Sequence, residues 1–284
     1  MVSGFINVYK PKNMTSAQVV SIVKKITNAK KVGHFGTLDP LATGVLPIAI
    51  NNATKLFDYF LNKDKKYIAV FRFSETTDTL DQGGKIIKTN CKIPTEKNVR
   101  DVLSIFIKQY MQTPPLYSAK NVDGQRAYAL ARKGKDFSLK AKKVSIYDIN
   151  YIEKIDELSH KLLIHCSSGT YIRSLARDIA YELNTCGFMS ELERVESGYF
   201  NKKNAITLDY LKEHGFEDNL INIIDVLGDL NKREIDKKYY DKIINGVKIK
   251  IDIEDIDNFL LYCDNKLIGI SESKDNVVKV KIRL

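Results

Sequence analysis

The chain has 284 residues, of which 44% are hydrophobic, and its 45 Lys and Arg outnumber 35 Asp and Glu for a formal charge of +10. This length can bury a substantial core and suits one large domain with a small one. No apolar run approaches the roughly 18 residues of a membrane span, and the first residues lack a signal-peptide pattern, so we expect a soluble, cytoplasmic protein without membrane contact.

The positive charge favours a polyanionic partner such as nucleic acid. The many Lys, Asn and Ile residues are also typical of an AT-rich genome, so charge alone does not establish nucleic-acid binding. Sequence motifs must decide between the two explanations. The four cysteines are scattered without a Cys-x-x-Cys pair, and the four histidines add no metal-ligand spacing. We therefore expect neither a structural metal nor a disulfide framework.

The first residues predict a strand followed by a helix. Residues 5–9 alternate as a half-buried strand does, and the strand ends before Pro11. Asn13 tolerates the positive φ that a tight turn requires. Thr15 or Ser16 can then cap a helix with one apolar face.

The glycine-rich stretch 33–47, GHFGTLDPLATGVLP, contains only two ionisable side chains, His34 and Asp39. Pro40 directs Asp39 toward an extended or turn conformation, and a carboxylate between two leucines is costly to bury without a partner. An isolated Asp-Pro pair would indicate only a loop turn. In this apolar setting we instead expect a cationic side chain to contact Asp39.

Strands and helices alternate through the centre of the chain. We expect strands at Val45–Ile50, Lys65–Phe73, Val144–Ile152 and Lys161–Cys166, and helices at Ala53–Leu61, Pro94–Gln109 and Tyr171–Leu183. By pattern alone Tyr67 is a core aromatic, and Thr76–Asp81 is a structural polar turn. Arg173 opposes the dipole at the start of its helix, so an anion facing it explains its position better than helix stability does.

The segment from about residue 112 to 142 is basic, with aromatic residues between the charges, and a solvated charged helix would explain it. Around residues 227–236 the chain becomes polar, which predicts a domain boundary. Beyond it we expect a helix at Tyr239–Gly246 and short strands at Phe259–Cys263, Leu267–Ile270 and Val277–Ile282.

Four stretches together resemble motifs of the tRNA pseudouridine-55 synthase family, the TruB type. They are residues 33–47, residues 10–16 (KPKNMTS), residues 169–178 (GTYIRSLARD) and residues 192–200 (LERVESGYF). Glu193 stands where the family usually has an arginine, so no role of that arginine is carried over.

The resemblance implies an α+β pseudouridine-synthase fold, in which helices flank a mixed, mainly antiparallel sheet. Residues 1–229 would form the catalytic domain, with an RNA-clamping insertion at about residues 112–142. Residues 230–284 would form a small β-rich, PUA-like RNA-binding domain.

The resemblance also assigns roles to single residues. Asp39 would be the catalytic carboxylate, paired with Arg173, and Tyr67 would stack on the target base and support catalysis. The substrate pocket would be completed by His34, which fills the place of the flipped base, and by Tyr171 and Leu192. Contacts to the RNA backbone are expected from Lys10, Lys120, Arg126, Arg132 and Arg194.

The implied function is the isomerisation of one uridine to pseudouridine in the T-arm loop of tRNA (position 55), by base flipping and an aspartate-dependent rearrangement of the glycosidic bond. Asp39 could attack the ring, attack the sugar or act as a base. We expect a monomer that needs no metal or other cofactor.

Two alternatives compete with this function. A non-catalytic RNA-binding protein or tRNA-folding chaperone would need the basic surface, but not Asp39, Tyr67 and Arg173 together. A phosphate-binding enzyme built on the glycine-rich stretch would need a Gly-Lys-Ser/Thr ending, which the sequence lacks.

Overall fold

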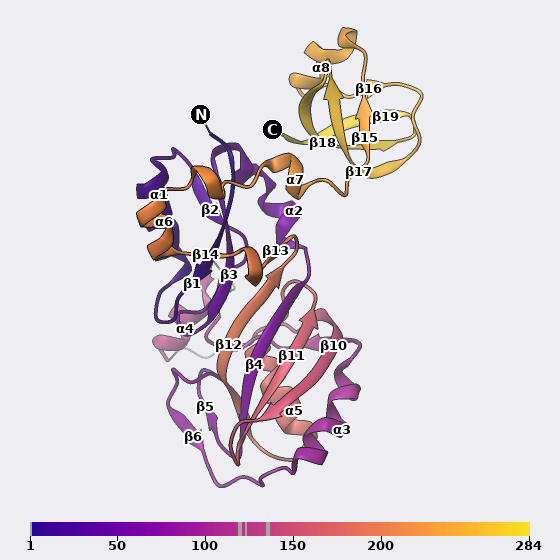
Figure 1. The fold of residues 1–284 in the computed structure, drawn as a ribbon. Coiled ribbons are helices and arrows are strands. Elements are labelled where there is room, and N and C mark those ends of the chain that lie inside the picture. Colours follow the sequence, from indigo (N-terminus) through magenta and orange to yellow (C-terminus); the bar gives the residue numbers. More distant parts are fainter. Residues whose placement is uncertain (1, 119–120, 123, 135–136) are drawn as a thin grey trace.

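The computed structural model describes residues 2–118, 121–122, 124–134 and 137–284. Most of its strands belong to one large sheet (Figure 1). They are β1 (Gly4–Lys10), β2 (Val32–His34), β3 (Thr43–Ile50), β4 (Lys65–Phe73), β7 (Gln109–Gln112), β10 (Lys142–Lys154), β11 (Ser159–Cys166), β12 (Gly187–Ser197), β13 (Phe200–Asn201) and β14 (Ile206–Thr207).

The strand order across this sheet is β14-β1-β3-β12-β4-β11-β10-β7, with β2 added to β3 and β13 to β12. The β1–β14 and β3–β12 pairs are parallel, and the other pairs are antiparallel. The predicted α+β fold with a mixed, mainly antiparallel sheet is therefore confirmed. The strand predicted at Lys65–Phe73 has the bounds of β4.

Helices α1 (Ser16–Thr27) and α6 (Leu208–His214) lie side by side on the half of the sheet that contains β1 and β3 (Figure 1). Thr15 caps α1, since its hydroxyl accepts from Gln18 N at 3.1 Å while Gln18 Oε1 accepts from Thr15 N at 2.8 Å. The preceding turn places Asn13 at φ 63°, as predicted.

The other half of the sheet is covered on one face by α3 (Glu96–Phe106) and α5 (Ile172–Glu182). The helix predicted to reach Gln109 ends at Phe106, because residues 109–112 pair with β10 as strand β7 instead. A short hairpin of β5 (Thr76–Thr77) and β6 (Ile86–Lys88) lies at the far end of this half (Figure 1).

The two halves of the sheet meet through one short parallel contact, in which Glu193 and Arg194 of β12 pair with Thr43 and Gly44 of β3. A Cβ atom on Gly44 would lie 2.2 Å from the Arg194 carbonyl oxygen, and Gly44 has a φ of 106°. Only glycine fits this close approach. The loop that contains Asp39 therefore enters β3 at the junction of the halves.

The helix predicted at 53–61 is divided into two elements, a 3-10 helix η1 (Asn51–Leu56) followed by α2 (Phe57–Leu61). The segment predicted as an insertion contains β8 (Asn121–Val122), β9 (Gln125–Arg126) and α4 (Ala127–Arg132). A 3-10 helix, η2 (Lys202–Asn204), joins β13 to β14, and after α6 the chain leaves the large sheet through η3 (Glu217–Asn219) and α7 (Ile223–Val226).

The C-terminal residues form a second sheet, separate from the first in Figure 1. Its elements are β15 (Lys232–Glu234), η4 (Lys237–Tyr239), α8 (Tyr240–Ile244), β16 (Ile249–Lys250), β17 (Ile256–Cys263), β18 (Lys266–Lys274) and β19 (Val277–Arg283), with strand order β15-β17-β18-β19-β16. Leu260 and Ile270 belong to one apolar cluster with Phe5, Phe35 and Phe60 of the first part. The two sheets thus share an apolar contact.

The expectation of no disulfide needs correction, because Cys91 and Cys186 are joined with their Cα atoms 5.9 Å apart. The bond links the segment after β6 to the start of β12. The two cysteines are 95 residues apart in the sequence, so the sequence did not indicate that they are neighbours. They are brought together when the hairpin folds back onto the sheet. Among the described residues, no helix is both long and apolar enough to cross a membrane.

Candidate active site

The loop that carries Asp39 is fastened to the start of the chain by backbone and side-chain contacts. Ala42 N donates to Asp39 O at 3.0 Å, which closes a turn over Pro40. Asn13 N donates to Pro40 O at 2.8 Å. The Ser16 hydroxyl donates to Leu38 O at 3.0 Å. The Asp39 backbone is therefore fixed by residues at the start of α1 and just before it.

The Arg173 guanidinium donates to two carboxylates. Nε lies 3.1 Å from Asp39 Oδ2 and Nη2 lies 3.5 Å from Asp39 Oδ1, while Nη1 lies 3.0 Å from Asp81 Oδ2. Nη1 also donates to Thr79 O at 3.2 Å, and Nη2 to Tyr117 O at 3.1 Å. The expected cationic partner of Asp39 is thus present, and its planar fork contacts both oxygens of the carboxylate.

Asp81 is a member of the site that sequence reasoning missed. Its side chain is buried, with the residue 6% exposed, and it accepts from the Thr79 hydroxyl at 2.7 Å and from Gly83 N at 3.0 Å. The sequence pattern favoured a structural role for this turn over a catalytic one. A second acidic residue in a polar turn was the available signal, but only the fold brings it to Arg173.

The surroundings of Asp39 change its acidity. Burial raises the pKa of the carboxyl, the Arg173 charge opposes this, Asp81 adds to the rise, and Lys10 opposes it. The Asp39 side chain nevertheless keeps 36% of its surface exposed. A substrate can therefore reach a carboxylate that is more basic than an ordinary surface aspartate.

Tyr67 and Leu192 lie under the Asp39 loop. Both belong to one apolar cluster with Leu38 and Ala42, which flank Asp39 in the loop. The Tyr67 residue is only 8% exposed, and burial raises the pKa of its hydroxyl to about 12. The loop and the sheet thus bring a neutral phenol close to the carboxylate.

The predicted contact of Arg194 with RNA phosphates must be corrected. Arg194 is 1% exposed, donates from Nε to Val45 O at 2.8 Å and from Nη2 to Gly36 O at 2.9 Å, and lies opposite Tyr67 on the neighbouring strand. A guanidinium enclosed in this way cannot reach solvent. It fastens the glycine-rich loop to β12 and Tyr67 instead.

Lys10 needs the same correction, since it is 0% exposed. Its ammonium donates to Met14 O at 2.6 Å, Pro11 O at 2.9 Å and Pro40 O at 3.2 Å. Burial lowers the pKa of Lys10 to about 8, although the negative charge of Asp39 acts to raise it. Lys10 therefore supports the turn after Asp39 from inside and does not contact a bound backbone.

His34 and Tyr171, which the resemblance assigns to the substrate pocket, lie on two further segments of the chain. His34 ends β2, its Nδ1 atom is buried without a hydrogen-bond partner among the described residues, and burial lowers its pKa. Tyr171 directly precedes α5, and burial raises its pKa, as the Asp39 charge also does. Both rings are thus uncharged, half-buried surfaces on which a planar group can stack.

The predicted contacts of the insertion remain predictions. Lys120 lies outside the described residues, and Arg126 is the last residue of β9. Arg132 ends α4, with its guanidinium carbon 5.9 Å from the centre of the Tyr128 ring. An arginine beside an aromatic ring is suited to RNA contact.

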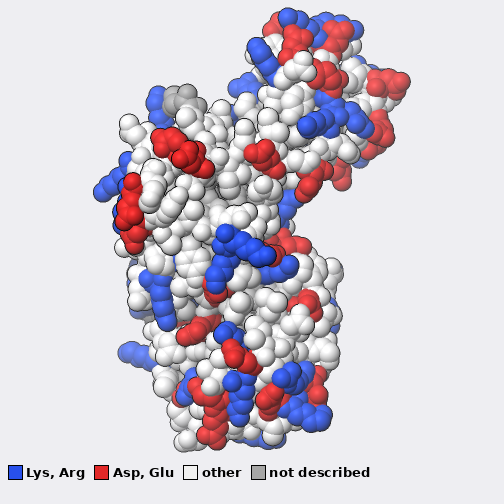
Figure 2. All heavy atoms as spheres, viewed as in Figure 1, with Lys and Arg blue, Asp and Glu red and all other residues white. Residues whose placement is uncertain are grey.

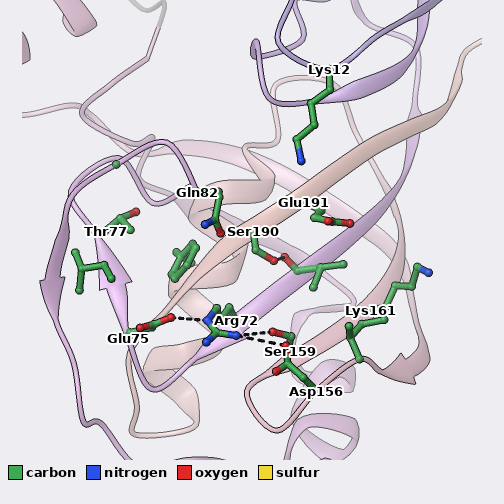
Figure 3. Close-up of a pocket in the computed structure, with 15 residues that line it drawn as sticks. Lys12, Arg72, Glu75, Thr77, Gln82, Asp156, Ser159, Lys161, Ser190 and Glu191 are labelled. Carbon is green, nitrogen blue, oxygen red and sulfur yellow. Dashed lines mark hydrogen bonds and ion pairs between the residues drawn. The ribbon is translucent and has the colours of Figure 1, made fainter.

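A cavity of about 630 Å³ lies on the face of β4 opposite the apolar cluster, because Arg72 lines it while the neighbouring Phe71 and Phe73 belong to the cluster. Figure 3 shows Lys12 pointing into it from above and Arg72 lying between Glu75 and Asp156. None of the predicted site residues within the described ranges lines it. The charged side chains on its floor largely pair with one another, so we place the candidate active site at Asp39 and not in this cavity.

The arrangement supplies one reactive group, a partly exposed carboxylate held at two points by a guanidinium above an apolar floor. Such a carboxylate can act as a nucleophile or as a base toward a planar ring or its sugar. Cys166 does not compete as a nucleophile, because it is buried and burial raises its pKa to about 12.

Known proteins are similar to this chain over nearly its full length. The model of the TruB family pseudouridylate synthase N-terminal domain matches residues 24–172, and that of the tRNA pseudouridylate synthase B C-terminal domain matches residues 173–247. The tRNA pseudouridine synthase B of Clostridium tetani is 39% identical over 98% of this chain and 98% of its own length. That of Caldanaerobacter subterraneus subsp. tengcongensis is 40% identical over 99% and 98%.

Solved structures with a similar fold include a crystal structure of a Cbf5-Nop10-Gar1 complex. It matches with a TM-score of 0.70 at 26% identity, covering 95% of this chain and 78% of that chain. The structure of an H/ACA RNP bound to a substrate RNA containing 2'-deoxyuridine matches with a TM-score of 0.71 at 24% identity, covering 99% and 84%. The second likeness concerns the fold alone.

Proposed function

Because this chain belongs to the TruB family of pseudouridylate synthases, whose curated relatives act on tRNA, we propose that it converts one uridine in the T-arm loop of tRNA to pseudouridine. The reaction breaks the bond between the sugar and the ring nitrogen, rotates the uracil and rejoins it through carbon. The base must therefore stay in the site between the two steps.

The pairing of Asp39 with Arg173 carries this proposal. The chemistry needs a group that can attack or deprotonate the nucleotide, and a partly exposed carboxylate with a raised pKa meets this need. A non-catalytic RNA-binding protein would have no use for a buried guanidinium shared between two carboxylates. Burying such charges costs free energy that their pairing only partly offsets, and groups of this kind cluster at functional sites.

Access to the nucleotide requires base flipping, because a base stacked in a folded RNA loop cannot present its sugar bond to Asp39. His34 is suited to fill the vacated stack, since its ring is uncharged and half-buried. Tyr67 and Leu192 form the floor on which the uracil would lie. Tyr171, which is close enough to Asp39 for the carboxylate to raise its pKa, would flank the base.

Three roles for Asp39 fit this geometry. The carboxylate can attack the uracil ring, attack the anomeric carbon of the sugar, or remove a proton from the sugar. In each of them Arg173 orients the carboxylate, and the apolar floor keeps water from the intermediate.

The experiment that tests the function is to incubate the protein with unmodified tRNA and map pseudouridine by carbodiimide-stop sequencing. We expect one stop, in the T-arm loop. Stops elsewhere in the tRNA would contradict the T-arm position, and binding without any stop would favour an RNA chaperone.

Asp81→Asn tests the electrostatics of the site. The amide keeps an oxygen for Arg173 but removes a negative charge that raises the pKa of Asp39. We expect that pKa to fall, so the carboxylate stays ionised to lower pH and the acid limb of kcat/KM moves to lower pH. We also expect the plateau value of kcat/KM to fall about 10-fold, because the weakening of one charge-assisted hydrogen bond costs roughly 1.5 kcal/mol.

The exposed Asp101→Asn is the matched control for this substitution, because it makes the same chemical change on the surface of α3. Its pH profile should match that of the wild type. An acid limb that stays in place in Asp81→Asn would show that Asp81 does not act on the charge of Asp39.

A whole tRNA carries many phosphates outside its T-arm, so we expect its binding to use basic surface away from Asp39. The face in Figure 2 carries both signs of charge intermingled over the lower half of the molecule and over the C-terminal sheet. A cavity of about 860 Å³ between η1, α2 and β19 is more one-sided, since Lys55, Lys63, Lys281 and Arg283 line it against a single acid, Asp58. We propose that residues 230–284 form an RNA-binding domain that contacts tRNA phosphates beside this cavity.

Replacing Lys281 and Arg283 with glutamine tests whether residues 230–284 bind the outer tRNA, because both side chains line the cavity from β19. A truncation would not, because it would also uncover the apolar cluster shared by Leu260 and Ile270. For full tRNA we expect weaker binding and a salt slope lower by about one for each phosphate that is no longer neutralised. Turnover of a short T-arm stem-loop should change less than about two-fold, since that RNA would contact mainly the surroundings of Asp39.

The control carries the same reduction of charge at Lys97 and Lys154, which are exposed elsewhere. It should leave both substrates unaffected. Equal losses on full tRNA and on the stem-loop would mean that the C-terminal sheet supports the catalytic part and does not bind the outer tRNA.

A further inference from the structure

Gln112, the last residue of β7, is a buried amide beside the active site, with 2% of the residue exposed. Its Oε1 accepts from Tyr171 N at 2.8 Å, and its Nε2 donates to Tyr171 O at 3.2 Å. One side chain thus satisfies both polar groups of the Tyr171 backbone, as a neighbouring strand would. The bonds fix the residue that flanks the proposed base pocket.

The position of Tyr171 matters because α5 begins there. Tyr171 is the N-cap residue of this helix, yet its own side chain makes no capping hydrogen bond. The first turn also carries Arg173, whose positive charge opposes the helix dipole. A helix start without a side-chain cap and with an unfavourable charge needs support from outside, and Gln112 supplies it.

The orientation of the Gln112 amide is set by a second chain of hydrogen bonds. Its Nε2 donates to the Tyr110 hydroxyl at 2.7 Å, and that hydroxyl donates to Asp178 Oδ2 at 3.3 Å. Asp178 pairs with Arg177 at 2.7 Å. Because the hydroxyl gives its proton to Asp178, it accepts from the amide, so the NH₂ group must face Tyr110 and the oxygen must face Tyr171 N.

The segment after Gln112 is attached to the same helix. Thr113 O accepts from the Ser174 hydroxyl at 2.8 Å and from Arg177 Nη2 at 2.9 Å, and Tyr117 O accepts from Arg173. The first two turns of α5 are therefore held along residues 112–117. Within this contact, Gln112 is the member that bonds the Tyr171 backbone directly.

We propose that Gln112 is a positioning residue for the reaction, and that its amide holds the Tyr171 backbone so that the Tyr171 ring and the Arg173 guanidinium keep their places around Asp39. The inference rests on the proposed function. A glutamate cannot replace this glutamine, because a carboxylate has no proton to donate to Tyr171 O and would face the Asp178 side chain through Tyr110.

The test is Gln112→Glu, which has nearly the same shape. We expect the single-turnover rate at saturating enzyme to fall roughly 10- to 100-fold, as for a small misplacement of reacting groups. We expect the Kd for tRNA to stay within about two-fold, because phosphate contacts set it. Gln109→Glu is the matched control, since Gln109 is exposed on the same strand, and it should behave as the wild type.

A second variant tests the same proposal if Gln112→Glu folds poorly. Tyr110→Phe removes the hydroxyl that orients the amide but keeps the ring, which packs 5.9 Å from the Phe106 ring. We expect it to lower the rate by about 3- to 10-fold, as for one hydrogen bond of modest strength, with Kd and the melting temperature close to wild type.

The outcomes separate this inference from the proposed function. A rate lowered without a change in Kd or melting temperature supports positioning, whereas a parallel change in all three would show a merely structural role and overturn it. Full activity of both variants would also overturn it. If the wild-type protein itself makes no pseudouridine, the proposed function fails before Gln112 is tested.

Discussion

Replacing Asp39 with asparagine is expected to abolish pseudouridine formation, to below roughly a thousandth of the wild-type rate. The amide has nearly the shape of the carboxylate but can neither attack the nucleotide nor accept its proton. Tyr67, Leu192 and the rest of the pocket keep their packing, because the Asp39 side chain lies at the edge of the apolar cluster. The loss should therefore appear in the chemical step.

Binding of tRNA by this variant should stay within a few-fold of wild type, since phosphate contacts supply most of the affinity. Single-turnover assays and filter binding measure the two quantities separately. Asp101→Asn on the exposed side of α3 serves as the control. Residual activity above about a tenth of wild type would remove Asp39 from the catalytic role, because a nucleophile or base cannot be dispensable.

Substitution of Arg173 should have the second largest effect. The Arg173→Ala variant leaves Asp39 and the buried Asp81 without their shared partner, and breaking a buried pair typically costs about 3–5 kcal/mol. We expect turnover to fall by at least roughly 100-fold and the melting temperature to fall as well. Since Arg173 lowers the pKa of Asp39, its removal should raise that pKa and move the acid limb of any remaining activity to higher pH.

Arg173→Lys should restore little of this activity. The guanidinium contacts both oxygens of Asp39 and one oxygen of Asp81 in a single plane, and an ammonium cannot span these three positions. Arg100→Lys, at an exposed pair on α3, is the control and should match wild type. A lysine variant almost as active as wild type would show that Arg173 acts as a point charge, without orienting the carboxylate.

Several features of this protein are determined by the sequence itself, because they depend on neighbours along the chain. The alternation in residues 65–73 defines β4, Thr15 starts α1 through its own hydroxyl, and Asn13 accepts the positive φ of the preceding turn. The need of Asp39 for a cation also follows locally, from a carboxylate among apolar residues. These predictions were correct since local geometry and burial cost decide them.

The tertiary structure alone decided which charged side chains are exposed. Lys10 and Arg194 look like phosphate contacts in a basic chain, but the close approach of β3 to β12 encloses Arg194, and the turn at Pro40 encloses Lys10. The ends of predicted elements shifted for the same kind of reason. The helix predicted to end at Gln109 ends at Phe106, because residues 109–112 pair with β10.

The full set of residues around Asp39 also required the fold. Arg173 lies 134 positions from Asp39 in the chain and 92 from Asp81, and Gln112 lies 59 from Tyr171. A pattern along the chain can state that a carboxylate needs a cation, but not which second acid shares it or which amide holds its helix. Those identities depend on distances across the sheet junction, which exist only once the two halves have packed.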